Sequence, residues 1–342
     1  MIKHTAFVIS FVVILTLLSC HKKRVVHTSF YYWKTVYEVS AVEKNYTDSL
    51  HCEKLYVRIM DVNAGDNGPV PVSPVSFKQP LSYSLPIVPV VFIVNRVLQN
   101  QTHQQLNQLA SKMVYFVNGK VKQAGKSGFN ELQIDCDWTR TTQSNYFYLL
   151  QRLKVNNYLK GKTLSATLRL HQLKNQKSSG VPPVDRVMLM CYNMGNLRKY
   201  GTQNSILEQS ELEKYMNNSL TVYPLPVDVG LPLFSWAVVF RQKQYLGIAK
   251  RLQSQNFENS KIFKSTANNL YTLQEDLPTF GLKRGDEIRW ETISPNKLKT
   301  AASYIQKYIT SDTLNIIYFH LDEPTIKHYT YETLEETAAL FR

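Results

Sequence analysis

The segment 130–137 alternates polar and apolar side chains in a way that could place chemistry on one face of a strand. Gln133, Asp135 and Asp137 share one parity, and the residues between them are apolar. Successive side chains of a β-strand point to opposite faces, so a strand here carries two carboxylates on the same face. Asp135 and Asp137 are therefore candidate catalytic residues for acid–base chemistry.

A second segment, 164–171, shows the same alternation. Thr167, Arg169 and His171 share one parity, while small and apolar side chains hold the other. Arg58 likewise interrupts an otherwise apolar stretch. These residues bring guanidinium groups and an imidazole to the same kind of polar face as the carboxylates.

The charged groups of these segments must pair if they face a closed interior, because burying a lone charge costs several kcal/mol. We expect Arg58 and Arg169 to neutralise Asp135, with Asp137 nearer an open rim. One interpretation is a closed internal network of ion pairs without chemistry. The other is a polar floor for a ligand. The members of that floor would be Asp137, Arg169, His171 and His320.

Further carboxylates follow other apolar stretches. Asp61 ends one such stretch, and Asp322 and Glu323 follow another. Each could supply the second group of an acid–base pair. The alternatives are structural: Asp61 caps a turn, and Glu323, which precedes Pro324, begins a helix.

Aromatic and amide side chains stand at or just beyond the ends of these stretches. The aromatic ones are Trp33, Trp138, Tyr192 and Trp236, and the amides are Asn95 and Asn193. Flat rings suit stacking on the apolar face of a ligand such as a sugar, and amides can hydrogen-bond to its hydroxyls. Core packing of the rings and capping of loop backbone by the amides are the structural alternatives.

Strand-like and helix-like segments alternate along the chain and would position these residues. Eight apolar or β-branched stretches favour strands: 29–33, 55–61, 87–95, 130–137, 164–171, 185–193, 227–234 and 314–321. Helical apolar spacing occurs in 102–116, 144–154, 205–216, 295–309 and 331–341. The alternation predicts an α/β fold, a (β/α)8 TIM barrel. Long loops follow strands 2 and 7, at 63–85 and 235–291, on the face where barrel enzymes bind ligands.

Two short motifs resemble those of a known enzyme family. Asp135-Cys-Asp137-Trp138 is similar to the strand-four motif of family 18 chitinases, and Met190-Cys-Tyr192-Asn193 to their strand-six motif. The resemblance implies a glycoside-hydrolase-like barrel and a glycan ligand. In that family a Glu that serves as general acid lies two residues beyond the second Asp, and here that position is Thr139. Because hydrolysis needs a proton donor for the leaving oxygen, the chitinase mechanism does not carry over.

The N-terminus predicts export and a lipid anchor. Residues 1–19 combine a short basic start with an apolar run that is typical of a signal peptide and too short to span a bilayer. The ending Leu17-Leu18-Ser19-Cys20 resembles the bacterial lipobox, which implies acylation of Cys20; the alternative is the end of an ordinary signal peptide. We therefore expect a signal peptide at 1–19, a lipidated tether at 20–28 and a single barrel domain at 29–342. The absence of acidic residues directly after Cys20 favours the periplasmic side of a bacterial membrane. Lys22, Lys23 and Arg24 can bind anionic head groups beside the anchor.

Over the whole barrel, the sequence is similar to a group of bacterial lipoproteins related to glycoside hydrolases.

The composition of the chain excludes several other classes of protein. The 342 residues include 40 Lys and Arg, 26 Asp and Glu and 44% hydrophobic residues, so the chain is neither disordered nor fibrous. Cys52, Cys136 and Cys191 lack CxxC spacing. We expect no metal, no cofactor and no nucleic-acid partner, because the sequence has neither a phosphate-binding glycine loop nor a nucleic-acid motif.

Two functions from different classes remain. The first is a glycan hydrolase of the cell envelope that uses Asp137 together with Asp61, Asp322 or Glu323. The second is a non-catalytic barrel that binds a carbohydrate or a protein partner. The absent strand-four Glu favours the second function, and the inward Asp, Arg and His side chains favour the first.

Overall fold

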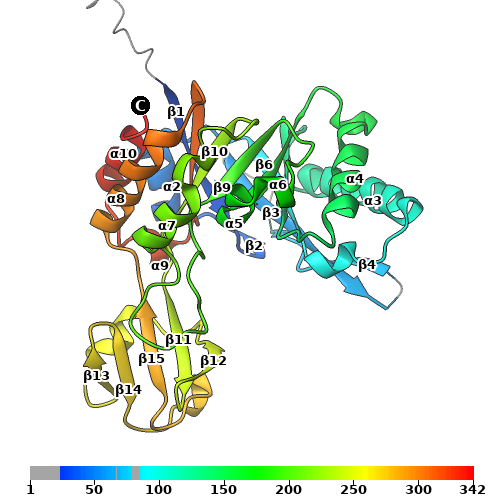
Figure 1. Ribbon diagram of the computed structural model, residues 1–342. Helices are drawn as coiled ribbons and strands as arrows, with labels where there is room; N and C mark the ends of the chain where they lie inside the picture. Colours follow the sequence, from blue (N-terminus) through cyan, green and yellow to red (C-terminus); the bar gives the residue numbers. More distant parts are fainter. Residues whose placement is uncertain (1–23, 67, 79–84) are drawn as a thin grey trace, which may run out of the picture.

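Eight parallel strands form a closed ring at the centre of the molecule. The structure, a computed structural model, describes residues 24–66, 68–78 and 85–342. Each strand of the ring pairs in parallel with its neighbours, and β1 closes the ring by pairing with both β3 and β16. The strands are β1 (Val25–Tyr32), β3 (Leu55–Gly65), β6 (Ile87–Ile93), β7 (Glu131–Cys136), β8 (Thr163–Arg169), β9 (Arg186–Met190), β10 (Val227–Pro232) and β16 (Thr313–Phe319). With the helices that cover its outside (Figure 1), the ring is the predicted (β/α)8 TIM barrel.

The barrel begins earlier than the sequence analysis expected. β1 starts at Val25, inside the predicted tether 20–28. The side chain of Arg24 donates three hydrogen bonds, at 2.7 to 2.9 Å, to backbone oxygens near the C-terminus of the chain. The guanidinium is therefore used inside the protein, and the predicted contact of this residue with head groups is wrong. The predicted signal peptide 1–19 and the lipidation site Cys20 lie outside the described residues.

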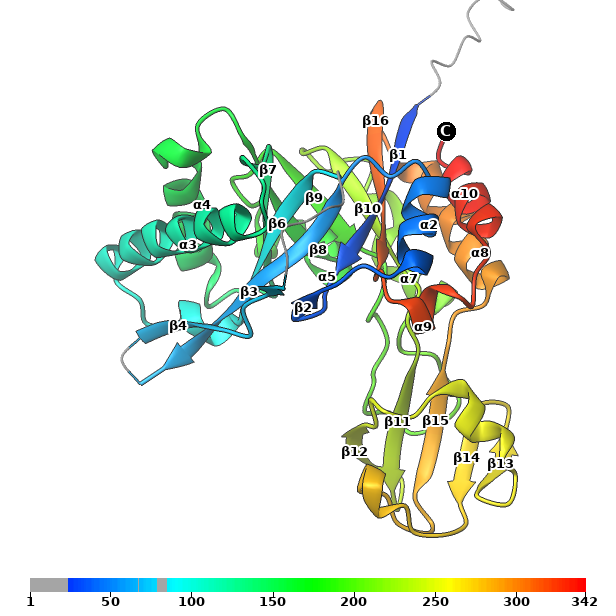
Figure 2. The same ribbon diagram turned by 180° about the vertical axis from the view of Figure 1, so that it is seen from behind.

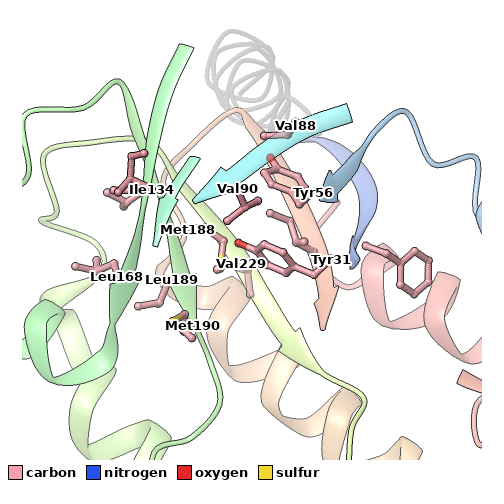
Figure 3. Packing of buried hydrophobic residues seen from close by; sticks show 14 of the residues in the cluster. Tyr31, Tyr56, Val88, Val90, Ile134, Leu168, Met188, Leu189, Met190 and Val229 are labelled. Carbon is pink, nitrogen blue, oxygen red and sulfur yellow. The ribbon is translucent and has the colours of Figure 1, made fainter. Parts of the chain in front are cut away.

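The polar parity of β7 faces the inside of the ring, as the alternation predicted. The Tyr31 hydroxyl on β1 donates a hydrogen bond to the Gln133 side chain on β7, although β3 and β6 lie between these strands in the ring. Figure 3 shows Tyr31, Val90 and Met188 close together inside the ring, whereas Ile134 lies on the other side of its strand. The apolar parity of β7 thus packs outward and leaves the polar side chains to the interior.

The five predicted helices are present, and among the described residues one further helix longer than five residues was missed. The predicted ones are α3 (His103–Gln123), α4 (Gln143–Lys154), α7 (Gln209–Met216), α8 (Pro295–Ile305) and α10 (Tyr331–Ala339). The missed helix is α2 (Ala41–Ser49), although Ser40 and Glu43 form a capping box that the sequence displays as Ser-x-x-Glu. After β8 the chain forms two short helices, α5 (Leu170–Lys174) and α6 (Gln176–Ser179). Because β8 ends at Arg169, His171 lies in α5 and not on the strand where the alternation placed it.

The strand β3 carries a bulge and extends beyond the ring. Its register against β6 shifts between Arg58 and Met60, so one extra residue reverses the alternation of the strand. Arg58 and Asp61, three residues apart, therefore share a face. Beyond the ring β3 forms a hairpin with β4 (Gly68–Val72), and β5 (Ser76–Phe77) pairs with β2 (Val36–Tyr37), so part of the predicted loop 63–85 is strand.

The insertion after β10 folds as an antiparallel sheet with its own core. The order of this insertion sheet is β12-β11-β15-β14-β13. Its strands are β11 (Trp236–Arg241), β12 (Gln244–Ile248), β13 (Phe263–Ala267), β14 (Leu270–Leu273) and β15 (Glu287–Glu291). Buried side chains that include Phe257, Phe263, Leu273 and Ile288 form a cluster separate from the barrel core. Figure 2 shows the sheet projecting from the end of the ring where the strands point.

Candidate functional site

Two arginine–aspartate ion pairs lie at the C-terminal face of the ring, which we call the mouth. Arg169, the last residue of β8, contacts the two carboxylate oxygens of Asp137 at 2.5 and 2.7 Å. Arg58 contacts the two carboxylate oxygens of Asp61 at 2.6 and 2.7 Å. The prediction that both arginines neutralise Asp135 is therefore wrong. Each guanidinium instead meets a carboxylate at its own height in the ring, because Asp137 directly follows β7 and the bulge in β3 brings Asp61 to the face of Arg58.

Asp135 lies deeper than these pairs, where burial changes its ionisation. Its side chain is buried and accepts a hydrogen bond from the Thr167 hydroxyl at 2.6 Å. Burial raises the pKa of Asp135 to about 6; the Asp137 carboxylate adds to the increase, while Thr167 and Arg169 oppose it. Asp137 stands nearer the rim, as predicted, with 44% of its side chain exposed. Asp135 is thus a carboxyl that exchanges its proton near pH 6, well above the usual range of an aspartate.

The position of the chitinase acid is occupied by an exposed threonine. The Thr139 hydroxyl lies 3.0 Å from that of Thr141 and 3.3 Å from that of Thr142. Thr142 in turn donates a hydrogen bond to the Asn95 side chain at 2.5 Å. The Asn95 side chain therefore serves as a hydrogen-bond acceptor for the turn that begins α4. This is the structural role that the sequence offered as the alternative to ligand binding. A threonine hydroxyl does not supply the proton that a carboxyl would.

Trp138 belongs to the core and not to a stacking surface. Only 2% of this residue is exposed, and its indole nitrogen donates a hydrogen bond to the Ser179 backbone oxygen at 2.9 Å. Its ring stacks on Tyr146 of α4, with ring centroids 5.1 Å apart. Trp138 borders the cavity that Asp137 and Arg169 line, but its burial under α4 leaves no ring face open for stacking, so the prediction of Trp138 as a ligand platform is wrong.

The remaining predicted aromatic residues form a cluster at the mouth, with Phe319 at its centre. Phe319 lies 5.4 to 5.7 Å, between ring centroids, from Tyr31, Trp33, Tyr192 and Phe234. Trp236 joins the cluster through Phe234, at 5.2 Å. Phe234 and Phe319 were missed, although Phe234 ends the predicted strand 227–234 just as Trp33 ends its own, and Phe319 lies two residues before the end of 314–321. We call this group the aromatic floor: Trp33, Tyr192, Phe234, Trp236 and Phe319.

Two cavities open at the floor and meet at Asn193. The first has a volume of about 330 Å³ and is lined by Asp137, Arg169, His171, Tyr192, Asn193 and Tyr215. The second, which we call the cleft, has about 450 Å³ and lies between the barrel and the insertion sheet. It is lined by Asn193, Phe234, Trp236, Gln253, Phe319, His320 and Asp322. Tyr215 and Gln253 were missed, because only packing between distant segments brings α7 and the insertion to the mouth.

Two residues of the cleft have buried polar atoms without a hydrogen-bond partner. They are Nδ1 of His320 and Nε1 of Trp236, and neither finds a partner within the described residues. Burial lowers the pKa of His320, although the Asp322 carboxylate opposes the shift, so the imidazole is neutral at pH 7. Burial also lowers the pKa of His171 in the first cavity. A buried polar atom without a partner costs about 1–3 kcal/mol, which a ligand hydroxyl at the cleft would recover.

The two carboxylates after β16 take different positions. Asp322 lines the cleft, and its carboxylate lies 3.9 Å from the Lys34 ammonium. Glu323 is the first residue of α9 (Glu323–Ile326), and its carboxylate pairs with Lys327 at 2.5 Å. The hydrogen bond from Lys327 lowers the pKa of Glu323, which therefore stays ionised at neutral pH. The helix-start interpretation of Glu323 is confirmed.

A buried ion pair attaches the insertion sheet beside the mouth. Arg289 and Glu291 on β15 have 0% exposed side chains, and the Arg289 Nε atom lies 2.7 Å from Glu291 Oε1. Glu291 accepts hydrogen bonds from the backbone and the hydroxyl of Ser205, and Arg289 donates one to the Lys199 backbone oxygen at 2.7 Å. Both charges thus hold the segment 193–207, which leads away from the first cavity, against the insertion sheet.

Metal ligands do not gather in the part of the chain that the structure describes: no three His, Cys, Asp or Glu side chains there are placed to hold an ion. Within 24–66, 68–78 and 85–342, no helix has both the length and the apolar character needed to cross a bilayer.

Cys52, Cys136 and Cys191 are buried free thiols, and burial raises the pKa of each. These thiols are therefore protonated at neutral pH.

Solved structures of glycan-active enzymes share this fold. The spore cortex-lytic enzyme SleL of Bacillus cereus matches with a TM-score of 0.57 and 15% identity, over 93% of this chain and 75% of that chain. A chitinase of Chromobacterium violaceum matches with a TM-score of 0.54 and 11% identity, over 92% and 99%. A Group II chitinase domain of Ostrinia furnacalis, in complex with penta-N-acetylchitooctaose, matches with a TM-score of 0.54 and 11% identity, over 93% and 96%. At such identities the similarity establishes the fold. No family model and no curated protein matches the sequence.

Proposed function

We propose that this protein binds a glycan at the mouth of its barrel. The observation that carries the proposal is the cleft, where the aromatic floor lies beside two buried polar atoms without partners, on His320 and Trp236. Sugar rings have apolar faces that stack on aromatic side chains and hydroxyls that satisfy polar atoms of this kind. One solved structure with this fold holds a chitooligosaccharide. That ligand supports an N-acetylated glycan as the first candidate.

Binding without hydrolysis fits the carboxylates best. Most glycoside hydrolases use one carboxyl that gives a proton and a second one at a set distance from it, and substrate-assisted families still need the proton donor. Asp137 and Asp61 are each held through both oxygens by an arginine, and Glu323 is held by Lys327 on the outside of the mouth. Thr139 stands where the chitinase acid would be. The ion pairs thus keep the carboxylates of Asp61, Asp137 and Glu323 charged and fixed in place, whereas a general acid must carry a proton and reach the substrate.

A hydrolase is the second candidate, and Asp135 is the observation that favours it. The raised pKa of Asp135, about 6, gives this carboxyl the protonation of a general acid. Asp135, however, is only 7% exposed, and its carboxylate accepts a hydrogen bond from Thr167. A glycosidic oxygen would have to pass the pair of Arg169 and Asp137 to reach it.

The test is a combined screen for binding and product release with the chain from Arg24 onward, which contains the whole ring and both cores. Chitooligosaccharides and peptidoglycan fragments are titrated by calorimetry, and the mixtures are then analysed by mass spectrometry. We expect binding without cleavage. Trp236→Ala should weaken binding at least about tenfold, as loss of a central aromatic contact does. The control Tyr331→Ala, at an exposed aromatic of α10, should leave the affinity unchanged.

Two results would contradict this proposal. If the protein cleaves a glycan and Asp135→Asn abolishes the cleavage, the protein is a hydrolase and not a non-catalytic binding protein. Absence of binding to every glycan in the panel, by a folded protein, would remove the glycan hypothesis altogether.

We further propose that Cys20 carries a lipid that anchors the protein in the cell envelope, facing the periplasm. The lipobox-like ending of the segment 1–19 supports this location. Metabolic labelling with an alkyne fatty acid should label the full chain, and Cys20→Ala should abolish the label. Equal labelling of both proteins would contradict acylation of this residue.

A further inference from the structure

The net charge of this protein is concentrated in one third of its sequence. Between Asp66 and Asp185 the chain has fourteen Lys and Arg but only three acidic residues, so this region supplies 14 − 3 = +11 of the total of +14. The basic residues are Lys78, Arg96, Lys112, Lys120, Lys122, Lys126, Arg140, Arg152, Lys154, Lys160, Lys162, Arg169, Lys174 and Lys177. The three acidic ones are Glu131, Asp135 and Asp137. The region includes β6, β7, β8 and the helices α3 and α4.

None of the three carboxylates lies on the outside of the barrel. Glu131 is 5% exposed and pairs with Lys54 at 2.7 Å, Asp135 is buried, and Asp137 is held by Arg169 at the mouth. The sequences of α3 and α4 and of the turns that follow them contain no acidic residue. On the outer surface Lys154 pairs with Asp185 at 2.7 Å and Lys78 with Glu38 at 3.3 Å. These carboxylates offset part of the charge of the exposed cations, and this part of the barrel keeps an excess of positive charge that produces a field over the whole face.

Exposed cations and exposed apolar side chains meet along the second half of α3 and at the end of α4. Tyr115 is 82% exposed, Tyr158 is 69% exposed and Val155 is 63% exposed. Tyr115 and Tyr158 line one open groove of about 510 Å³ together with Lys122. Exposed apolar side chains that gather in one patch, unlike single ones, mark a surface that contacts something else. We call the following residues the basic corner: Tyr115, Lys122, Arg152, Val155, Tyr158 and Lys160, all of which are exposed.

The basic corner extends from the outer side of α3, where Tyr115 also borders the hairpin of β3 and β4, toward the face of the barrel opposite the mouth. The turns after α3 and α4 lead into the first residues of β7 and β8, and in a parallel barrel all strands begin on the same face. β1 also begins there. Figure 1 shows the start of β1 at the top of the molecule and the insertion sheet at the bottom. A flat surface docked on this face would therefore leave the cleft open.

We propose that the basic corner binds the surface of a bilayer rich in anionic lipid and turns the mouth away from it. Each Lys or Arg near such a surface gains attraction from anionic head groups, and tyrosine rings favour the boundary between head groups and hydrocarbon. The exposed Val155 and the two tyrosines distinguish this surface from a site for a dissolved polyanion, which has no apolar layer for them to enter. The proposal does not depend on glycan binding or on acylation of Cys20.

The test measures co-sedimentation of the chain from Arg24 onward with vesicles. Vesicles of phosphatidylcholine containing phosphatidylglycerol should bind the protein, those of phosphatidylcholine alone should not, and added salt should weaken the binding. The triple variant Lys122→Gln, Arg152→Gln and Lys160→Gln should bind roughly 100-fold more weakly. The matched control Lys243→Gln, Lys261→Gln and Lys264→Gln removes the same charge from exposed positions of the insertion and should bind like the wild type.

The variant Tyr115→Ser with Tyr158→Ser separates a bilayer from a soluble polyanion. It should weaken binding to the anionic vesicles while leaving any binding of polyphosphate unchanged. Absence of binding to the anionic vesicles, or equal loss in the corner variant and the control, would overturn the proposal. So would tyrosine variants that bind the vesicles as tightly as the wild type.

Discussion

Replacement of Arg289 by Met tests whether the buried pair on β15 holds the insertion sheet to the barrel. The substitution leaves the Glu291 carboxylate charged in an environment where both side chains are 0% exposed. It also removes the donor to three backbone oxygens of the segment 193–207, at distances of 2.7 to 3.2 Å. Removing one partner of a buried ion pair costs about 3–5 kcal/mol, so we expect the free energy of unfolding to fall by about 4 kcal/mol.

The double variant Arg289→Met with Glu291→Met distinguishes a buried charge from simple loss of packing. It leaves no uncompensated charge, so we expect it to be more stable than Arg289→Met alone. It should remain below the wild type, because Ser205 loses the acceptor for its backbone and hydroxyl donors. The surface control Lys299→Met removes an exposed pair with Glu336 and should cost less than about 1 kcal/mol.

Urea denaturation followed by circular dichroism gives the free energies, and limited proteolysis reports on the segment 193–207. We expect Arg289→Met to be cleaved in this segment faster than the wild type, because the hydrogen bonds from Arg289 no longer hold the segment against the insertion sheet. The reasoning would be refuted if Arg289→Met stayed within about 1 kcal/mol of the wild type. It would also be refuted if the double variant were as unstable as the sum of its single variants.

Three further predictions concern the barrel itself. Ser40→Ala removes the capping box of α2 and should lower the free energy of unfolding by about 0.5–2 kcal/mol in urea denaturation; an unchanged midpoint would contradict the role of the cap. The folded-state pKa of Asp135, about 6, lies above the usual 3.8, so this group should reduce stability as pH rises through that interval. Asp135→Asn should remove this loss and exceed the wild type at pH 7 by roughly 3 kcal/mol, and equal pH profiles of both proteins would contradict it. Gly230→Ala would place a Cβ atom 2.6 Å from Met188 Sδ and 3.2 Å from the Tyr192 ring. The overlap should destabilise the protein by about 1–3 kcal/mol and, by displacing the Tyr192 ring, reduce glycan affinity. An unperturbed affinity would show that the Tyr192 ring does not form part of the site.

The fold follows from the sequence because its signals are local. Apolar stretches and helical spacing located all eight strands of the ring and five of its helices. The alternation in β7 also identified the inward face that carries Gln133 and Asp135, since parity is a property of any extended strand. α2 was missed for a different reason: its capping signal is present, but its apolar pattern is weak.

The candidate site was predicted only in part, because it depends on contacts between segments far apart in the chain. Composition and spacing pointed to Trp33, Tyr192 and Trp236, and the structure brings these residues into one aromatic floor. Nothing in the sequence places Tyr146 over Trp138, a contact that buries the face of that ring. Nor does the sequence reveal that the insertion forms a sheet and supplies one wall of the cleft.

The sequence by itself determined a ring of parallel strands with charged side chains inside, because strand periodicity is read from neighbouring residues. Only the tertiary structure decided which charges meet. The height of each strand in the ring pairs Arg169 with Asp137, and a bulge that no local pattern announces pairs Arg58 with Asp61. Those pairings set the chemistry of the mouth, and they arise from packing across the barrel.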